Sequence, residues 1–164
     1  MGRASLAIGV IASVMTLAST GAGAREVSIR RESLPAAVRD ALGTRYPGAK
    51  FMGLTREKEK GVMLYEAEMK VSGRRVDALM DANGALREEE AQIAQSELPE
   101  TVRQAHAQSA QAHWKIESIE RISFRTASTP QRFELRVSDG KRHLELIYGA
   151  NGKRLSAGVS DAKE

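Results

Sequence analysis

Cysteine is absent from this 164-residue chain. Disulfide crosslinks, thiol chemistry and cysteine-based metal sites are therefore excluded, as is a lipid-modified N-terminal cysteine. Aromatic residues make up only 4% of the chain. That scarcity argues against a carrier whose sheet folds over an apolar ligand pocket. The fold must be stabilised by packing alone.

A strong charge of one sign is also missing. The whole chain carries +4, and residues 1–24 contribute only Arg3, so the remainder has 24 basic against 21 acidic side chains, a net of +3. Mild, interspersed charge is typical of a solvated surface, whereas nucleic-acid binding needs basic residues clustered on one face. We expect no nucleic-acid partner.

The longest apolar run, residues 6–17, is about a dozen residues, short of the ~20 that span a bilayer. Arg3 precedes it and Ala22-Gly23-Ala24 follows it. This three-part pattern predicts a signal peptide over residues 1–24, cleaved after Ala24, and a periplasmic protein without stable membrane insertion. The mature chain would have 164 − 24 = 140 residues, enough for one domain or two half-sized units with a shared core.

Motifs of catalysis are absent from the sequence. It contains no G-x-S-x-G, no phosphate-binding glycine loop and no supported Ser/His/Asp set. The acidic pair Glu66/Glu68 and the run at residues 88–90 are predicted to lie on a wet sheet face among Lys and Arg, where a carboxyl group would not gain the raised pKa that acid–base catalysis needs. We expect no enzyme activity and no cofactor.

The three histidines do not indicate a metal site. His106 and His113 are seven residues apart, which does not match the i, i+4 spacing of helical zinc ligands. His106 falls on the predicted core face of a helix, so we expect it to be partly buried and hydrogen-bonded. His143 is expected on the wet side of a hairpin.

One segment is repeated within the chain. Residues 65–84 (YEAEMKVSGRRVDALMDANG) match residues 133–152 (FELRVSDGKRHLELIYGANG) at a shift of 68. In both copies apolar and polar residues alternate, a Gly-containing turn follows, alternation resumes, and Asn-Gly ends the segment. This pattern predicts a β-hairpin with one buried and one solvated face.

A second repeated element precedes each hairpin. SLPAAVRDAL from Ser33 matches ELPETVRQAH from Glu97 at a shift of 64, with apolar residues at helical spacing after a proline. A strand is expected near residues 50–56 in the first copy and over residues 114–122 in the second, after four additional residues. Each copy thus reads helix, strand, hairpin, strand.

The sequence therefore predicts an α+β fold of two tandem helix-plus-antiparallel-sheet units (α-β-β-β-β), with the helices on one face of a concave sheet. The expected first unit covers residues 25–92, the second residues 93–157, and residues 158–164 form a flexible tail. The expected core residues are Val38, Tyr65, Met69, Val102, Phe133, Val137 and Leu144.

These motifs resemble a known family. L-P-x-x-V-x-x-A-L, Y-P-G-A, Y-E-x-E, a short Gly turn and D-x-N-G-x-L, present from Leu34 to Leu86, are similar to the PepSY-like group of exported bacterial proteins, related in fold to the β-lactamase inhibitory protein. The resemblance covers about residues 33–155. It implies a non-catalytic, inhibitor-like periplasmic binding module whose partner is an unknown periplasmic protein, with enzymes among the candidates.

The expected docking surface is the polar face of the sheet, with mixed charge in both copies. Two further residues, Trp114 and an exposed Ile147, are the expected apolar anchors. An alternative is a small-ligand or calcium-binding periplasmic protein, since Asp81-Ala82-Asn83-Gly84 has some features of a calcium loop. The predicted charged docking residues are Glu66, Glu68, Arg75, Asp77, Glu134, Arg136, His143 and Glu145.

Overall fold

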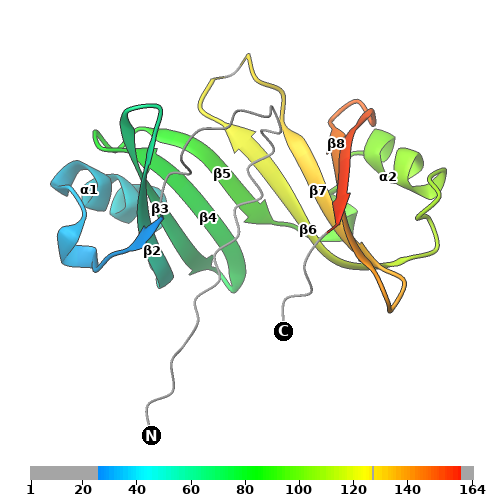
Figure 1. The fold of residues 1–164 in the computed structure, drawn as a ribbon, viewed down its shortest axis with the longest axis horizontal. Coiled ribbons are helices and arrows are strands. Elements are labelled where there is room, and N and C mark those ends of the chain that lie inside the picture. Colours follow the sequence, from blue (N-terminus) through cyan, green and yellow to red (C-terminus); the bar gives the residue numbers. More distant parts are fainter. Residues whose placement is uncertain (1–25, 127, 160–164) are drawn as a thin grey trace, which may run out of the picture.

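The computed structural model describes residues 26–126 and 128–159. The predicted signal peptide lies outside them. Within them the strands form one nine-stranded antiparallel sheet in which each strand pairs with the next along the chain (Figure 1). Helix α1 (Ala36–Arg45) precedes β2–β5, and helix α2 (Glu100–Ala107) precedes β6–β9. The strands are β1 (Val27–Ser28), β2 (Lys50–Glu59), β3 (Val62–Val71), β4 (Arg74–Asp81), β5 (Leu86–Gln92), β6 (Lys115–Phe124), β7 (Arg132–Ser138), β8 (His143–Gly149) and β9 (Arg154–Val159). The α+β class is confirmed.

Two hydrophobic cores lie along the sheet, one beneath each helix. Val38 and Leu42 of α1 pack on Met69 and neighbouring strand residues, and Val102 of α2 packs on Leu135. Cross-strand pairs connect the two cores along a single face of the sheet, so both helices cover the same face. In Figure 1 they lie at opposite ends of the sheet, and the strand directions rotate gradually between them, as strand twist requires.

The expected core residues are largely confirmed. Val38, Met69, Val102, Phe133 and Val137 are buried. Tyr65 and Leu144 pack against the cores but are only partly buried. Strand alternation therefore assigned Tyr65, Met69, Phe133, Val137 and Leu144 to the helix-covered face, and helical spacing assigned Val38 and Val102 to the side of each helix that packs on it.

The glycines of the two Asn-Gly turns lie in close contact with the helices. Gly84 and Gly152 both have positive φ, 77° and 80°. A Cβ at Gly84 would lie 2.5 Å from the carbonyl oxygen of Ala37, and one at Gly152 would lie 2.5 Å from that of Thr101. Glycine is needed here both for its backbone conformation and for the close approach of a helix.

The four additional residues of the second copy are divided between two places, which corrects the sequence prediction. Lys50 begins β2 and Lys115 begins β6, a shift of 115 − 50 = 65, one more than the 64 of the helices. The remaining three residues lengthen the β6–β7 connection, since the hairpin shift is 68. The repeat places the additional residues only somewhere between the matched helix and the matched hairpin. Where they lie within that stretch is decided by the pairing of the strands.

The C-terminal boundary also differs from the prediction. Gly158 and Val159 were expected in a flexible tail, but both belong to β9, where they pair with Glu145 and Leu144. Backbone hydrogen bonds to β8 order these residues although their side chains are exposed. Residues 160–164 lie outside the described part of the chain.

Candidate functional site

The polar face, as we define it, is the side of the sheet that the two helices leave uncovered. Register and alternation place many of the charged side chains on it, because directly opposed residues of neighbouring strands point to the same side. Glu68 opposes Asp77, Asp77 opposes Glu90, and Glu120 opposes Glu134. The polar face carries Glu66, Glu68, Arg75, Asp77, Glu88, Glu90, Glu120, Glu134, Arg136, His143, Glu145 and Ile147.

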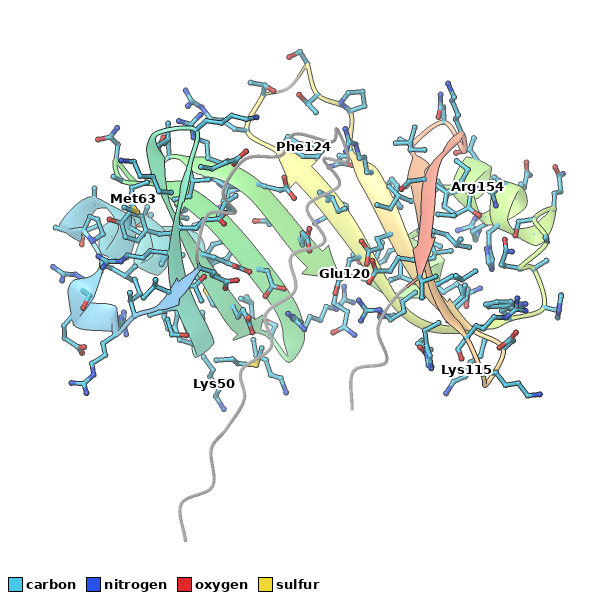
Figure 2. All side chains as sticks on the ribbon, in the orientation of Figure 1. Lys50, Met63, Lys115, Glu120, Phe124 and Arg154 are labelled. Carbon is cyan, nitrogen blue, oxygen red and sulfur yellow. The ribbon has the colours of Figure 1, made fainter. Side chains whose placement is uncertain are left out.

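Five carboxylates meet at the middle of this face. We call them the central acidic cluster: Asp77 of β4, Glu88 and Glu90 of β5, Glu120 of β6 and Glu134 of β7. Figure 2 labels Glu120 between the two halves of the sheet. The β5–β6 pairing joins the strands that follow α1 to the strands that follow α2 at this point, so the cluster combines residues from both sets of strands.

Arginine flanks the cluster on both sides. Arg75 Nε lies 2.9 Å from Asp77 Oδ2 and its Nη2 lies 3.9 Å from Glu68 Oε2. Arg136 Nη2 lies 2.7 Å from Glu145 Oε1 and 3.9 Å from Glu134 Oε1. Within the described ranges, no basic side chain forms an ion pair with Glu88, Glu90 or Glu120. Negative charge therefore exceeds positive charge at the centre of the face.

Two carboxyl groups of the cluster, Asp77 and Glu90, have raised pKa values, and so does the neighbouring Glu66. Burial, followed by the charges of Glu120 and Glu88, raises the pKa of Glu90 to about 9. Burial and the charge of Asp77 raise the pKa of Glu66 to about 8. Burial also raises the pKa of Asp77 to about 6, against the opposing effect of Arg75. Some of the carboxyl groups on this face are therefore protonated at neutral pH, because ionising all of them would place several negative charges close together.

Burial on the polar face corrects two expectations. The carboxylates were predicted to be wet, yet Glu66 and Glu90 are only 7% and 8% exposed, because long side chains on neighbouring inner strands cover one another. Ile147 was predicted to be an exposed anchor and is 2% exposed. It lies on β8, which has β7 and β9 on either side.

Trp114 lies away from the polar face. It is buried in the core beneath α2, and the guanidinium carbon of Arg142 lies 4.8 Å from its ring centroid. His143, by contrast, is on the polar face, with Nδ1 2.8 Å from Glu117 Oε2. The structure thus brings the predicted charged residues to one face but places the predicted aromatic anchor elsewhere.

Asp81 caps a turn, which accounts for the features that suggested a calcium loop. Its Oδ1 accepts hydrogen bonds from the backbone N–H groups of Asn83 at 3.0 Å and Ala85 at 3.1 Å, and its Oδ2 lies 2.8 Å from Arg87. Over residues 26–126 and 128–159, no group of three or more His, Asp or Glu side chains is arranged to hold a metal ion.

His106 differs from its prediction in one respect. It is buried, but neither ring nitrogen has a hydrogen-bond partner among the residues that the structure describes. Its ring meets that of Tyr148 edge-on at 6.4 Å between centroids. The helical spacing of apolar residues predicted the burial of His106. Its hydrogen bonds depend on which polar groups of other elements lie next to the ring, and helical spacing does not predict these.

Sequence reasoning missed Glu88, Glu90 and Glu120 as members of the site. The period-two spacing of Glu88 and Glu90 places both on one face of a strand, but it does not relate them to residues of the strands that follow α2. Pairing the last strand of the first copy with the first strand of the second would have brought Glu90 and Glu120 close together.

Comparison with known proteins supports the fold. No protein-family model matches the chain, and no curated protein matches it. A BLIP-like protein from Bacteroides fragilis is 21% identical with a TM-score of 0.59 over 80% of this chain and 89% of that one. A DUF2874 family protein from Bacteroides uniformis is 18% identical with a TM-score of 0.62 over 76% and 88%.

A third solved structure is provisionally described as a periplasmic protein of Bacteroides eggerthii. It is 17% identical, with a TM-score of 0.64 over 77% of this chain and 88% of that one. The chain therefore has the fold of BLIP-like and DUF2874 proteins. In the part of the chain that the structure describes, no helix is long and apolar enough to cross a membrane.

Proposed function

We propose that this protein is a non-catalytic periplasmic binding module that docks a protein partner on its polar face. The observation that carries the proposal is the central acidic cluster, which gathers five carboxylates from four strands on the face that neither helix covers. The BLIP-like protein of the same fold supports an inhibitor-like mode of docking.

The chemistry of the cluster favours a partner that presents Lys or Arg. Arg75 and Arg136 form ion pairs with Asp77 and Glu145, and among the described residues neither forms an ion pair with Glu90 or Glu120. A cationic side chain placed over these groups would favour their charged forms and lower their pKa values. Docking of such a partner therefore releases protons, and charge complementarity sets its orientation and association rate.

A defined probe tests the chemistry before the natural partner is known. A short oligolysine peptide should bind in calorimetric titrations, and the heat should depend on the ionisation enthalpy of the buffer because protons are released. The fully acetylated peptide should not bind. The variant Glu90→Gln/Glu120→Gln should bind at least about tenfold more weakly, the loss of one or two charge-assisted contacts.

A matched control keeps the same chemistry away from the cluster. Glu32→Gln changes an exposed carboxylate in the turn before α1 and should bind the peptide like the wild type. Equal loss in both variants would show that only overall charge matters. Unchanged binding in the cluster variant would overturn the assignment of the polar face.

We further propose that the chain is exported and cleaved after Ala24. The pattern of residues 1–24 and the provisional periplasmic description of one fold relative support this. Intact-mass measurement of protein recovered from the periplasm should give a chain that starts at Arg25. A retained Met1 would contradict the proposal.

We also propose that two tandem PepSY-like units build the molecule. Both halves place one helix before four strands, and each has its own hydrophobic core. The same glycine-to-helix contact recurs at Gly84 and Gly152. Duplication enlarges the polar face toward the ~800 Å² per partner of a standard interface.

A further inference from the structure

The two edges of the nine-stranded sheet are protected differently. Figure 2 labels Lys50 and Arg154, the first residues of β2 and β9, at opposite ends of the sheet. β1 pairs with the outer edge of β2 at two positions, and five of the ten β2 side chains are charged. Charged side chains and covering segments keep an edge strand from pairing with another chain. The β2 edge is therefore protected against association.

β9 lacks this protection. Among the described residues it pairs with β8 alone. Its only charged residue is Arg154 at its start, and it contains no proline. Leu155 and Val159 are 48% and 83% exposed, so large apolar side chains remain in solvent along this edge. An edge of this kind is a template for a further strand.

The matching inner strand shows that such an edge can pair. β9 matches β5 at the shift of 68, and both have a register shift at the same place, between Leu79 and Met80 of β4 and between Ile147 and Tyr148 of β8. The outer edge of β5 nevertheless pairs antiparallel with β6. A bulge at this position is thus compatible with a further strand on the outer side.

The outward-facing backbone groups of β9 follow from this match. The carbonyl oxygen of Arg87 accepts a hydrogen bond from Arg125 N–H at 3.0 Å, and Ile93 N–H donates to the carbonyl oxygen of Ile119 at 3.0 Å. Because the backbone groups of alternate residues point to opposite sides of a strand, residues 89 and 91 also face β6. In β9 the groups that point away from β8 are therefore the carbonyl oxygen of Leu155 and the backbone groups of Ala157 and Val159.

The side chains of the two matching strands differ. Residues 87–91 of the inner strand β5 read REEEA, and residues 155–159 of the edge strand β9 read LSAGV. Edge strands usually carry charge that opposes association, yet over these positions the inner strand has four charged residues and the edge strand has none. The composition of β9 is thus that of a strand with a neighbour on both sides.

We propose that β9 pairs antiparallel with β9 of a second copy of this chain, so that one sheet continues through both molecules. A two-fold axis at Ala157 sets Leu155 opposite Val159 of the partner subunit and Ala157 opposite Ala157 of the partner subunit. The outward-facing backbone groups then meet as hydrogen-bonded pairs, and no charged residue lies between these positions. The edge is self-complementary, which is why a second copy fits it.

The register follows from the direction of the side chains. Ala157 and Val159 lie opposite Leu146 and Leu144, so their side chains are on the helix-covered face. An axis between Ser156 and Ala157 would oppose side chains of different faces and would bring inward-facing backbone groups to the junction. The axis at Ala157 keeps the polar faces of both molecules on one side, so the dimer presents two polar faces next to each other.

Sedimentation velocity measures this association. The six residues of β9 form an edge that is small against the ~800 Å² per partner of a standard interface, so association should be weak. From ~1 μM to ~1 mM, a range that covers weak dissociation constants, the sedimentation coefficient of the wild-type protein should rise with concentration and level off at the dimer value. A monomer throughout this range would overturn the proposal.

A charge exchange at Ala157 tests the axis. Ala157 is exposed, so Ala157→Lys and Ala157→Glu should fold like the wild type, which urea unfolding checks. Each should dimerise at least about fivefold more weakly, because like charges are directly opposed at the axis. An equimolar mixture should associate more tightly than either variant alone, because the opposed charges then attract. No gain in the mixture would contradict the pairing of β9 with β9.

Met52 provides the matched control on the opposite edge. It lies in β2 and is 47% exposed. Met52→Lys and Met52→Glu should dimerise like the wild type, both alone and mixed. Losses equal to those at Ala157 would show a general effect of charge and would overturn the proposal. None of these measurements involves oligolysine binding at the polar face, so this inference and the proposed function fail separately.

Discussion

The cores beneath α1 and α2 are built on one frame but are completed differently. Beneath α1, Leu42 and Met80 are apolar, and Tyr46 donates a hydrogen bond from its hydroxyl to Glu89 Oε2 at 2.5 Å. Beneath α2, His106 and Tyr148 hold the matching positions of Leu42 and Met80, and within residues 26–126 and 128–159 their side-chain polar atoms have no hydrogen-bond partners. One core satisfies its buried polar group, and the other leaves these polar atoms unpaired.

This difference shows that a repeated frame does not require a repeated interior. Backbone pairing, helix placement and the glycine contacts at Gly84 and Gly152 recur in both halves. Those features depend on turns and on apolar alternation, which tolerate a change at single core positions.

The largest expected effect is the truncation of a core ring. Phe133→Ala should lower the free energy of unfolding by about 3–5 kcal/mol, because the ring is 3% exposed. Tyr65, its counterpart in the first half, is only partly buried, so Tyr65→Ala should cost less. Urea unfolding of both variants measures the difference. An equal or larger cost at Tyr65 would contradict the assigned burial.

The next effect tests whether the frame is shared. Gly84→Ala and Gly152→Ala force a methyl group against a helix carbonyl oxygen, so each should cost about 1–3 kcal/mol beyond Gly140→Ala. Gly140 also has positive φ, but a Cβ there would meet no atom of the described residues within 4 Å, so this variant isolates backbone strain. Thermal unfolding should show similar losses at Gly84 and Gly152. A loss of stability in only one of the two variants would show that the two glycine contacts are not equivalent.

A smaller effect concerns His106, the buried histidine of α2. His106→Leu should raise the free energy of unfolding by about 1 kcal/mol, because it removes unsatisfied polar atoms, whereas Leu42→His should lower it. The pKa of His106 in the folded state is below the ordinary 6.5, so the unfolded chain binds a proton more readily than the folded chain. The free energy of unfolding should therefore decrease as the pH falls below 6.5.

Urea unfolding above and below pH 6.5 checks this sign. The wild type should lose more stability than His106→Leu on acidification, and the difference between the two isolates the histidine from the carboxylates of the polar face. Equal losses would show that His106 is paired in solution.

The smallest effect is expected at Tyr148. Its hydroxyl has no hydrogen-bond partner among the described residues and the residue is 1% exposed, so Tyr148→Phe removes an unsatisfied polar group and should not lower the free energy of unfolding. Tyr46→Phe, which removes the bond to Glu89, should cost about 1 kcal/mol. A larger loss at Tyr148 would erase the contrast between the two cores.

Much of the fold could be predicted from residue patterns. Alternation assigned Met69 and Phe133 to the helix-covered face and Glu66 and Glu134 to the other, because side chains alternate between faces whatever the partner strand is. The degree of burial could not be predicted in the same way. Glu66 and Ile147 are buried on a face that was expected to be solvated. Side chains of adjacent strands cover them, and the pattern of a single strand does not show which side chains those are.

The amino-acid sequence alone determined the absence of disulfides, the α+β class, the turns and the face of strand residues such as Met69 and Phe133, because these depend on composition and on contacts between near neighbours in the chain. The tertiary structure alone decided that Glu90 and Glu120 meet and that the buried ring of His106 has no hydrogen-bond partner among the described residues. Both depend on the pairing of β5 with β6 and on the packing of α2. These contacts bring together residues that are far apart in the sequence, and no repeating pattern of neighbouring residues predicts them.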